Sequence, residues 1–168
     1  MSVGAYPAYR ESGSQWLGLI PAGWDMKPIW AVASCNDEIL EETTSPDYVM
    51  LYVEISDVDA VSGISGATEL AFAAAPSRAR RRVADGDVIV STVRTYLRAI
   101  APIVAPPANT IVSTGFAVLR PRKILPAYLA YLLRAEFTVA EIIARSTGVS
   151  YPAINARASR HLGDSQIT

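Results

Sequence analysis

The sequence has very few of the residues that build disulfides and metal sites. It contains one cysteine, Cys35, and one histidine, His161, among 168 residues. A single cysteine excludes an internal disulfide and is typical of the reducing cytoplasm, where we expect this protein. The same scarcity excludes a His/Cys metal site. A Ser-His-acid triad would depend on His161, which lies in a polar segment without a nucleophile elbow.

Further absences narrow the class of protein. No stretch approaches the roughly 18 apolar residues that a membrane span needs, and the N-terminus lacks the basic and apolar segments of a secretory signal. Neither a G-x-x-x-x-G-K-[ST] loop nor a G-x-G-x-x-G turn after a strand is present, so the common nucleotide-binding signatures are missing. With 51% hydrophobic and 18% charged residues, the chain has the composition of one globular domain.

Charge is distributed unevenly along the chain. Residues 1–75 hold two basic and eleven acidic residues, whereas residues 76–168 hold thirteen basic and five acidic ones. Such asymmetry is typical of a protein with one side that faces a polyanion such as nucleic acid. The alternative is that the two halves neutralise each other within one fold.

The most cationic stretch is residues 76–98, with six arginines and two aspartates. Four arginines fall within five residues, where they are candidates for contacts to phosphates or guanines. They cannot all share one face, so some must be solvated or paired with the acidic first half. These four candidates are Arg78, Arg80, Arg81 and Arg82.

Three more candidates follow at Arg94, Tyr96 and Arg98. If the preceding strand continues with its period of two, these side chains lie on one side of it and face the same ligand. The alternative is a structural ion pair, for instance between Arg94 and Asp87.

Hydrophobic patterning predicts an α+β fold, with a β-rich N-terminal part and helices mainly in the C-terminal third. Residues 1–23 are expected to form an irregular arm, and Ala71–Arg82 to begin as a short helix. A strand or strand-like edge that Pro28 interrupts is predicted at Trp24–Val32. Further strands are predicted at Tyr48–Ile55, Val88–Val93, Leu97–Val104, Thr110–Val112 and Phe116–Leu119. Helices are predicted at Pro126–Ala135 and Glu136–Arg145, the second with Phe137, Val139, Ala140, Ile142 and Ile143 inward. Six aromatic residues are expected in the core: Trp24, Trp30, Tyr48, Tyr52, Tyr128 and Tyr131.

One short pattern is similar to the PD…ExK metal site of many nucleases. Pro46-Asp47 is followed by Glu54-Ile55-Ser56, so a serine stands where that pattern has its lysine. Glu54 is better explained as a solvated or paired acid at the flank of a strand.

Five segments together resemble the specificity (S) subunits of type I restriction-modification enzymes. WLGLIPAGWDMKPI (16–29) resembles their opening W-L-G-x-I-P-x-x-W, and VADGDVIVSTVRTYLR (83–98) their G-D-[VI]-[LIV]-x-S-x-x-R segment. STGFAVLRP (113–121), STGVSYPAIN (146–155) and LGDSQI (162–167) are similar to later family segments. No single motif is specific, but the five occur in the family's order over nearly the whole chain.

The resemblance implies a single target recognition domain over residues 1–168, which binds double-stranded DNA and reads one half of a bipartite site. It implies no catalytic residue and no cofactor here, since S-adenosylmethionine, ATP and Mg²⁺ would belong to the modification and restriction subunits as partners. The chain ends at Thr168, where the family's spacer helix would begin, so that helix is expected to be absent.

Within this family, shared segments are expected to build the scaffold or grip the DNA backbone. Base choice is then expected in the unmatched loops 34–47, 57–70 and 105–110, where Asn36, Thr44 and Asn109 offer donors and acceptors. Thr147 and Tyr151 are candidates for a phosphate contact, with a simple helix stop as the alternative. The rival to DNA recognition is a non-catalytic protein-interaction or ligand-binding module whose charged halves pair internally.

Overall fold

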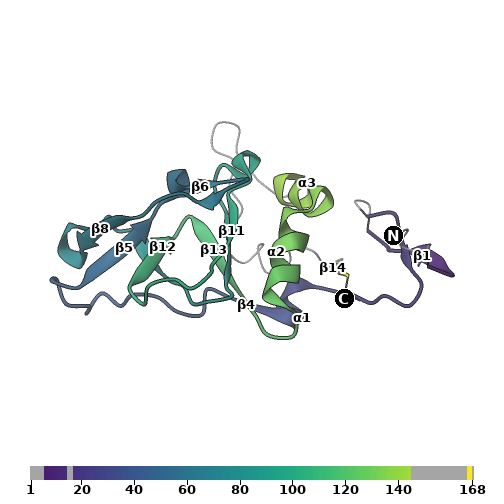
Figure 1. The fold of residues 1–168 in the computed structure, drawn as a ribbon, viewed down its shortest axis with the longest axis horizontal. Coiled ribbons are helices and arrows are strands. Elements are labelled where there is room, and N and C mark those ends of the chain that lie inside the picture. Colours follow the sequence, from purple (N-terminus) through teal and green to yellow (C-terminus); the bar gives the residue numbers. More distant parts are fainter. Residues whose placement is uncertain (1–5, 15–16, 145–165, 168) are drawn as a thin grey trace.

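A computed structural model describes residues 6–14, 17–144 and 166–167, and Figure 1 shows its fold. Strands dominate the chain up to residue 121, and helices α2 (Pro126–Arg134) and α3 (Glu136–Ala144) follow them. This confirms the predicted α+β class with helices in the C-terminal part. Within the described ranges, no helix has the length and apolar character needed to cross a membrane.

The first sheet has the strand order β11-β10-β13-β4, and all of its neighbouring strands are antiparallel. The turn at Asp85-Gly86 leads into its central strand, and Gly86 has a φ of 84° that favours glycine. The strands are β4 (Ala33–Cys35), β10 (Val88–Ser91), β11 (Ile100–Pro102) and β13 (Phe116–Pro121).

The second sheet has the strand order β8-β5-β12-β9. Strands β5 and β12 are parallel, whereas the other neighbours are antiparallel, and the β12–β9 register shifts between Val112 and Ser113. The strands are β5 (Val49–Val53), β8 (Thr68–Ala71), β9 (Ala79–Arg82) and β12 (Thr110–Ser113).

The core forms layers because strand β10 is buried on both faces. Val88 and Val90 pack with Leu129 and Leu133 of α2, whereas Ile89 packs with residues of the second sheet such as Val112. Helices α2 and α3 therefore cover one face of the first sheet, and the second sheet covers the other (Figure 1). A third cluster, on the far side of the second sheet, includes Leu40, Met50, Tyr52 and Ile111.

Smaller elements complete the described chain. A hairpin of β1 and β2 lies at the end of the molecule away from the second sheet (Figure 1). The small elements are β1 (Tyr9–Glu11), β2 (Leu19–Pro21), β3 (Met26–Lys27), α1 (Ile29–Val32), β6 (Val58–Asp59), β7 (Gly63–Ile64) and β14 (Gln166–Ile167). Three 3₁₀ turns are η1 (Ile55–Asp57), η2 (Phe72–Ala74) and η3 (Thr95–Leu97).

Four predicted strands are confirmed as β5, β10, β12 and β13, and both predicted helices are confirmed as α2 and α3. Four other expectations are wrong in whole or in part. The arm contains the β1–β2 hairpin, and Ala71–Arg82 holds a 3₁₀ turn followed by a strand. Leu97 lies in η3, so the strand that follows begins only at Ile100. Pro28 separates the short β3 from the helical turn α1, because proline cannot donate to a strand ladder.

Burial also differs from expectation at several aromatic and helical positions. Trp30 is 59% exposed because α1 turns Ile29 and Val32 inward instead, and Tyr131 is 73% exposed on the outer face of α2. Tyr52 is buried as predicted. Helix α3 is apolar on nearly every side, so its sequence did not reveal its inner face. Ile143 is exposed there, whereas Thr138 and Glu141 are buried.

Candidate nucleic-acid interface

Three of the clustered arginines lie on β9, at the edge of the second sheet. Arg80 and Arg82 are two residues apart and so share one side of the strand, where each guanidinium stacks on an aromatic ring. Arg80 lies 4.7 Å from the centroid of Phe72, and Arg82 lies 5.9 Å from that of Tyr48. Arg81 faces the other way, and its Nε is buried without an acceptor among the described residues. This part of the arginine run is therefore half-buried and packed rather than fully solvated.

Arg78 precedes β9 and is held by two residues at the end of β5, which lies two strands away in the sheet. Its Nε donates to the Tyr52 hydroxyl at 3.2 Å, and its Nη2 forms an ion pair with Glu54. The hydrogen bonds that Arg78 donates, first the one to the Tyr52 hydroxyl and then the one to the Glu54 carboxylate, raise the pKa of Arg78 above its usual value. Arg78 thus keeps its positive charge and a fixed position, with a side chain that is 53% exposed.

Arg94, Tyr96 and Arg98 do not share one side of a strand, contrary to the prediction. The chain leaves β10 and turns through η3, with Arg94 and Arg98 in left-handed conformations at φ values of 50° and 53°. Tyr96 is 52% exposed on this turn. Arg98 forms an ion pair with Glu136 of α3, and Asp87 binds Arg120 rather than Arg94.

A groove of about 810 Å³ lies where the two sheets meet beside η3. It brings Arg78 and Arg94 together, although sixteen positions of chain separate them, and it adds several hydroxyl groups and backbone turns. Thr92 anchors one wall, because its amide and its hydroxyl both donate to the Gly115 carbonyl, at 2.8 and 2.9 Å. The groove is lined by Glu54, Ile55, Ser56, Arg78, Thr92, Val93, Arg94, Leu97, Ser113, Thr114 and Gly115. Thr92 and Ser113 are buried, whereas Ser56 and Thr114 are exposed. Two exposed hydroxyl groups beside two arginines suit an anionic, hydrogen-bonding ligand.

The three residues expected to choose bases each contact the protein backbone. The Asn36 side-chain oxygen accepts from the Val118 amide at 2.9 Å, in a left-handed conformation with φ of 58°. Thr44 donates to the Glu41 carbonyl at 2.6 Å, and Asn109 donates to the Val49 carbonyl at 3.2 Å. None of the three lines the groove. Thr147 and Tyr151 lie outside the described residues.

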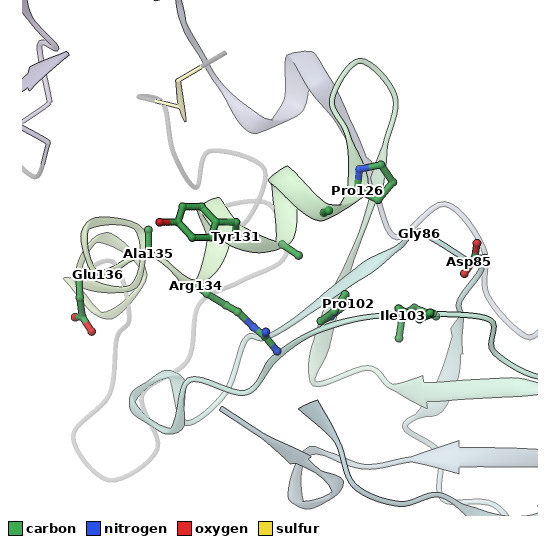
Figure 2. Close-up of a pocket in the computed structure, with 12 residues that line it drawn as sticks. Asp85, Gly86, Pro102, Ile103, Pro126, Tyr131, Arg134, Ala135 and Glu136 are labelled. Atoms are coloured by element: carbon green, nitrogen blue, oxygen red, sulfur yellow. The ribbon is translucent and has the colours of Figure 1, made fainter. Parts of the chain in front are cut away.

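A second groove of about 850 Å³ is less polar than the first (Figure 2). It runs between α2 and the segment around Pro102 and Ile103, and its lining is mainly apolar. Arg134 extends across it, but both its Nε and its Nη2 donate to the Ile100 carbonyl, at 3.1 and 2.9 Å. With Asp85 and Glu136 also in its lining, this groove does not suit a polyanion.

The nuclease-like pattern is not assembled into a metal site in the part of the chain that the structure describes. No group of three or more His, Cys, Asp or Glu side chains is placed there to hold a metal ion. Glu54 instead binds Arg78, so the alternative of a paired acid is confirmed.

The acidic first half does pair with the basic second half. Arg78 binds Glu54, Arg120 binds Glu38, and Arg122 binds Asp37. Part of the charge asymmetry is therefore neutralised internally, as the sequence required for some of the arginines.

Tyr52, Glu54 and Thr92 belong to the site but were not among the predicted site residues. Tyr52 was expected only as a core residue, and the strand pattern around it gives no sign that its hydroxyl reaches an arginine 26 positions away. Glu54 follows Tyr52 by two residues, and this spacing places both side chains on one side of an extended chain. That spacing is the sequence signal that could have indicated that Tyr52 and Glu54 contact the same partner, Arg78.

Neither a family model nor a curated protein matches this chain. Several solved structures do, and two of them are at least 32% identical to it. The first concerns complex assembly and conformational transition of the type I R-M system, and it is similar at a TM-score of 0.75 with 34% identity over 85% of this chain. The second is the HsdS subunit from Thermoanaerobacter tengcongensis, at a TM-score of 0.74 with 32% identity over 85% of this chain. The chain spans 37% of the length of each.

Proposed function

Because the chain belongs to the family of type I restriction-modification specificity subunits, we propose that it is a target recognition domain. It binds double-stranded DNA and reads one half of a bipartite site. The observation that carries this proposal is the groove at the junction of the two sheets, which joins Arg78 and Arg94 to a set of hydroxyl groups. Guanidinium and hydroxyl donors are the groups that bind phosphate oxygens and base edges.

In this proposal the chain performs no chemistry itself. It positions a modification subunit, which methylates adenine with S-adenosylmethionine, and a restriction subunit, which uses ATP and Mg²⁺. Base flipping belongs to the modification subunit. The support is the membership of the family of specificity subunits.

A salt titration of duplex binding tests the proposal. The purified chain is titrated with a fluorescent duplex, and anisotropy is measured between 50 and 300 mM salt. Each phosphate neutralised contributes a slope of about −0.9 to log K against log[salt], so we expect a steep decline. Arg78→Ala combined with Arg94→Ala should reduce both the affinity and the slope. Arg122→Ala, away from the groove, should leave them nearly unchanged.

Methylome sequencing provides a second test in the intact system. A host that carries the complete gene should show adenine methylation at a split sequence, and replacement of residues 1–168 should change one half of that sequence only. Methylation that ignores this replacement would contradict the assignment.

A non-catalytic interaction module is the second candidate, favoured by the ion pairs that join the two charged halves. Under that function the chain would show no salt-dependent duplex binding, because its arginines are already neutralised. The anisotropy titration therefore decides between the two functions.

A further inference from the structure

Tyr52 and Glu54 hold the Arg78 guanidinium from one side. Tyr52 lies on β5 and is only 4% exposed, so its hydroxyl is a fixed acceptor for the Arg78 Nε. Glu54 follows at the end of the same strand, where its carboxylate binds Nη2. The two acceptors come from one rigid element and bind one edge of the planar Arg78 guanidinium.

The backbone on both sides of this contact is also fixed. The Arg78 carbonyl accepts from the Thr114 amide at 2.8 Å, and Thr114 lies in the turn that lines the same groove. The Glu54 amide donates to Asp57 Oδ2 at 2.9 Å, which anchors the residue that binds the guanidinium. Arg78 is therefore constrained at its main chain and at its side-chain terminus.

This arrangement does little for stability, because partly exposed ion pairs contribute little to the free energy of unfolding. Its effect is to remove rotamer freedom from a long side chain before any ligand arrives. Preorganisation of this kind lowers the entropic cost of binding and is typical of a residue that must present its donors in one direction.

The constrained guanidinium still has donors to offer. It carries five N–H groups, and its contacts with Tyr52 and Glu54 use two of them. The remaining three include donors on both terminal nitrogens, which suit a pair of adjacent acceptors. In the major groove of DNA, guanine presents such a pair in O6 and N7.

A carboxylate beside the arginine favours a base over a phosphate. Glu54 cancels much of the local positive charge, which weakens attraction to a phosphate but leaves the directional hydrogen bonds to a neutral base intact. A residue that served only as a phosphate clamp would gain nothing from this neighbour.

We propose that Arg78 reads a guanine in the recognised half-site, and that Tyr52 and Glu54 are positioning residues for it. The inference rests on the proposed DNA-recognition function. It assigns base choice to a residue of the arginine-rich stretch, in addition to the unmatched loops.

The test is selection from a duplex pool with randomised central positions, followed by sequencing of the bound fraction. The full chain should enrich a motif with one guanine preferred by roughly ten- to a hundred-fold, the range for a bidentate pair. Arg78→Lys should reduce the preference at that position to a few-fold, because lysine cannot donate in a fork, and leave other positions unchanged. Tyr52→Phe should weaken the preference at the same position.

The Glu54→Gln variant distinguishes a positioning role of Glu54 from a purely structural one. Removal of a negative charge should raise the overall affinity for duplex DNA while the preference for guanine falls. A purely structural role would instead lower the melting temperature and weaken binding to all sequences alike. Arg122 is the matched control, because Ser34 and Asp37 hold it with the same two chemistries outside the groove. Arg122→Lys should leave the motif unchanged.

The test distinguishes failure of the inference about Arg78 from failure of the proposed function. If the wild-type chain binds no duplex in a salt-dependent way, the proposed function fails and the inference fails with it. If the wild type selects a motif that Arg78→Lys leaves unaltered, only the inference is overturned. It is also overturned if Arg78→Lys weakens all sequences equally, which is the behaviour of a phosphate contact. Arg78 is half exposed, so its lysine variant carries the test even if Tyr52→Phe fails to fold.

Discussion

Arg120 is enclosed by two carboxylates where β13 runs beside β10. Its Nε and Nη2 each donate to Asp87 at 2.9 Å, and Nη1 binds Glu38. Hydrogen bonding to Asp87 raises the pKa of Arg120 against the opposing effect of burial. Asp87 is 1% exposed and also accepts from the Ala84 amide at 2.8 Å, so this pair ties the Asp85-Gly86 turn to the sheet.

Asp87→Asn should destabilise the chain by about 3 kcal/mol, because it leaves a largely buried guanidinium with half of its charge compensation. Urea unfolding followed by tryptophan fluorescence measures the loss. The matched control is Glu136→Gln in the exposed Arg98 pair, which should leave the unfolding midpoint nearly unchanged. Equal effects from both substitutions would contradict the difference in burial.

Gly86→Ala should destabilise the chain by about 1–2 kcal/mol, because its φ of 84° is unfavourable for any residue with a Cβ atom. The added methyl group would also lie 3.3 Å from the Pro126 ring. Gly66 has no neighbour within 4 Å of such a methyl group and serves as the control. Thermal unfolding of the two variants should differ by several degrees; similar melting temperatures would argue against strain at Gly86.

At the level of single residues, the sequence identified candidate arginines but not the residues that pair with them. Arg120 and Glu38 are 82 positions apart, and only the pairing of β13 with β4 brings them together. The left-handed turns at Arg94 and Arg98 were equally hidden, because arginine rarely adopts that conformation and no glycine marks them.

Strands β4 and β13 are tied together by an ion pair at their ends. Burial opposes ionisation of Asp37, but hydrogen bonds from Ser34 and Arg122 lower its pKa below the ordinary value. A carboxylate with a lowered pKa in the folded state stabilises the fold above its unfolded pKa of about 3.9. That stability is lost as the pH falls through the folded value.

Asp37→Asn should therefore destabilise the chain at pH 6 and have a shrinking effect as the pH falls below about 4. Urea unfolding of both proteins at pH 6, 4 and 3 gives the difference in free energy. A constant difference across this range would show that the charge of Asp37 contributes nothing.

Elements with strong periodicity were predicted well, whereas elements set by neighbours were not. Strand β10 could be predicted from the sequence because its residues are mostly β-branched and buried on both faces. Helix α2 could be predicted because its apolar residues form one stripe along the helix. The one-turn helix α1 and the strand β9 could not be predicted, since the first is too short for a period and the second is stabilised by pairing with β12.

For the whole molecule, the net charge and the charge distribution lead to opposite expectations about binding to a polyanion. A chain with a pI near 5.8 should not bind a polyanionic resin at neutral pH if charge is evenly spread. Among the described residues, the groove at the junction of the sheets holds Arg78, Arg94 and only one acid, Glu54, so it keeps a net positive charge, and three more arginines lie on β9 nearby in sequence. Local rather than net charge governs association with a polyanion.

We therefore expect heparin resin to retain the chain at pH 7.5 and low salt, and to release it as salt rises. Arg78→Glu with Arg94→Glu should abolish retention, whereas Arg122→Glu should not. Flow-through of the wild-type chain would show that the internal ion pairs neutralise the surface fully.

The parallel pairing of β5 with β12 has a consequence for biosynthesis. It joins Tyr52 to Ile111, and the turn that follows β12 supplies Ser113, Thr114 and Gly115 to the groove. Contacts of such long sequence separation form late, after a large loop has closed. A nascent chain therefore cannot assemble this groove until Gly115 has left the ribosome, because its lining includes residues of the β12–β13 turn.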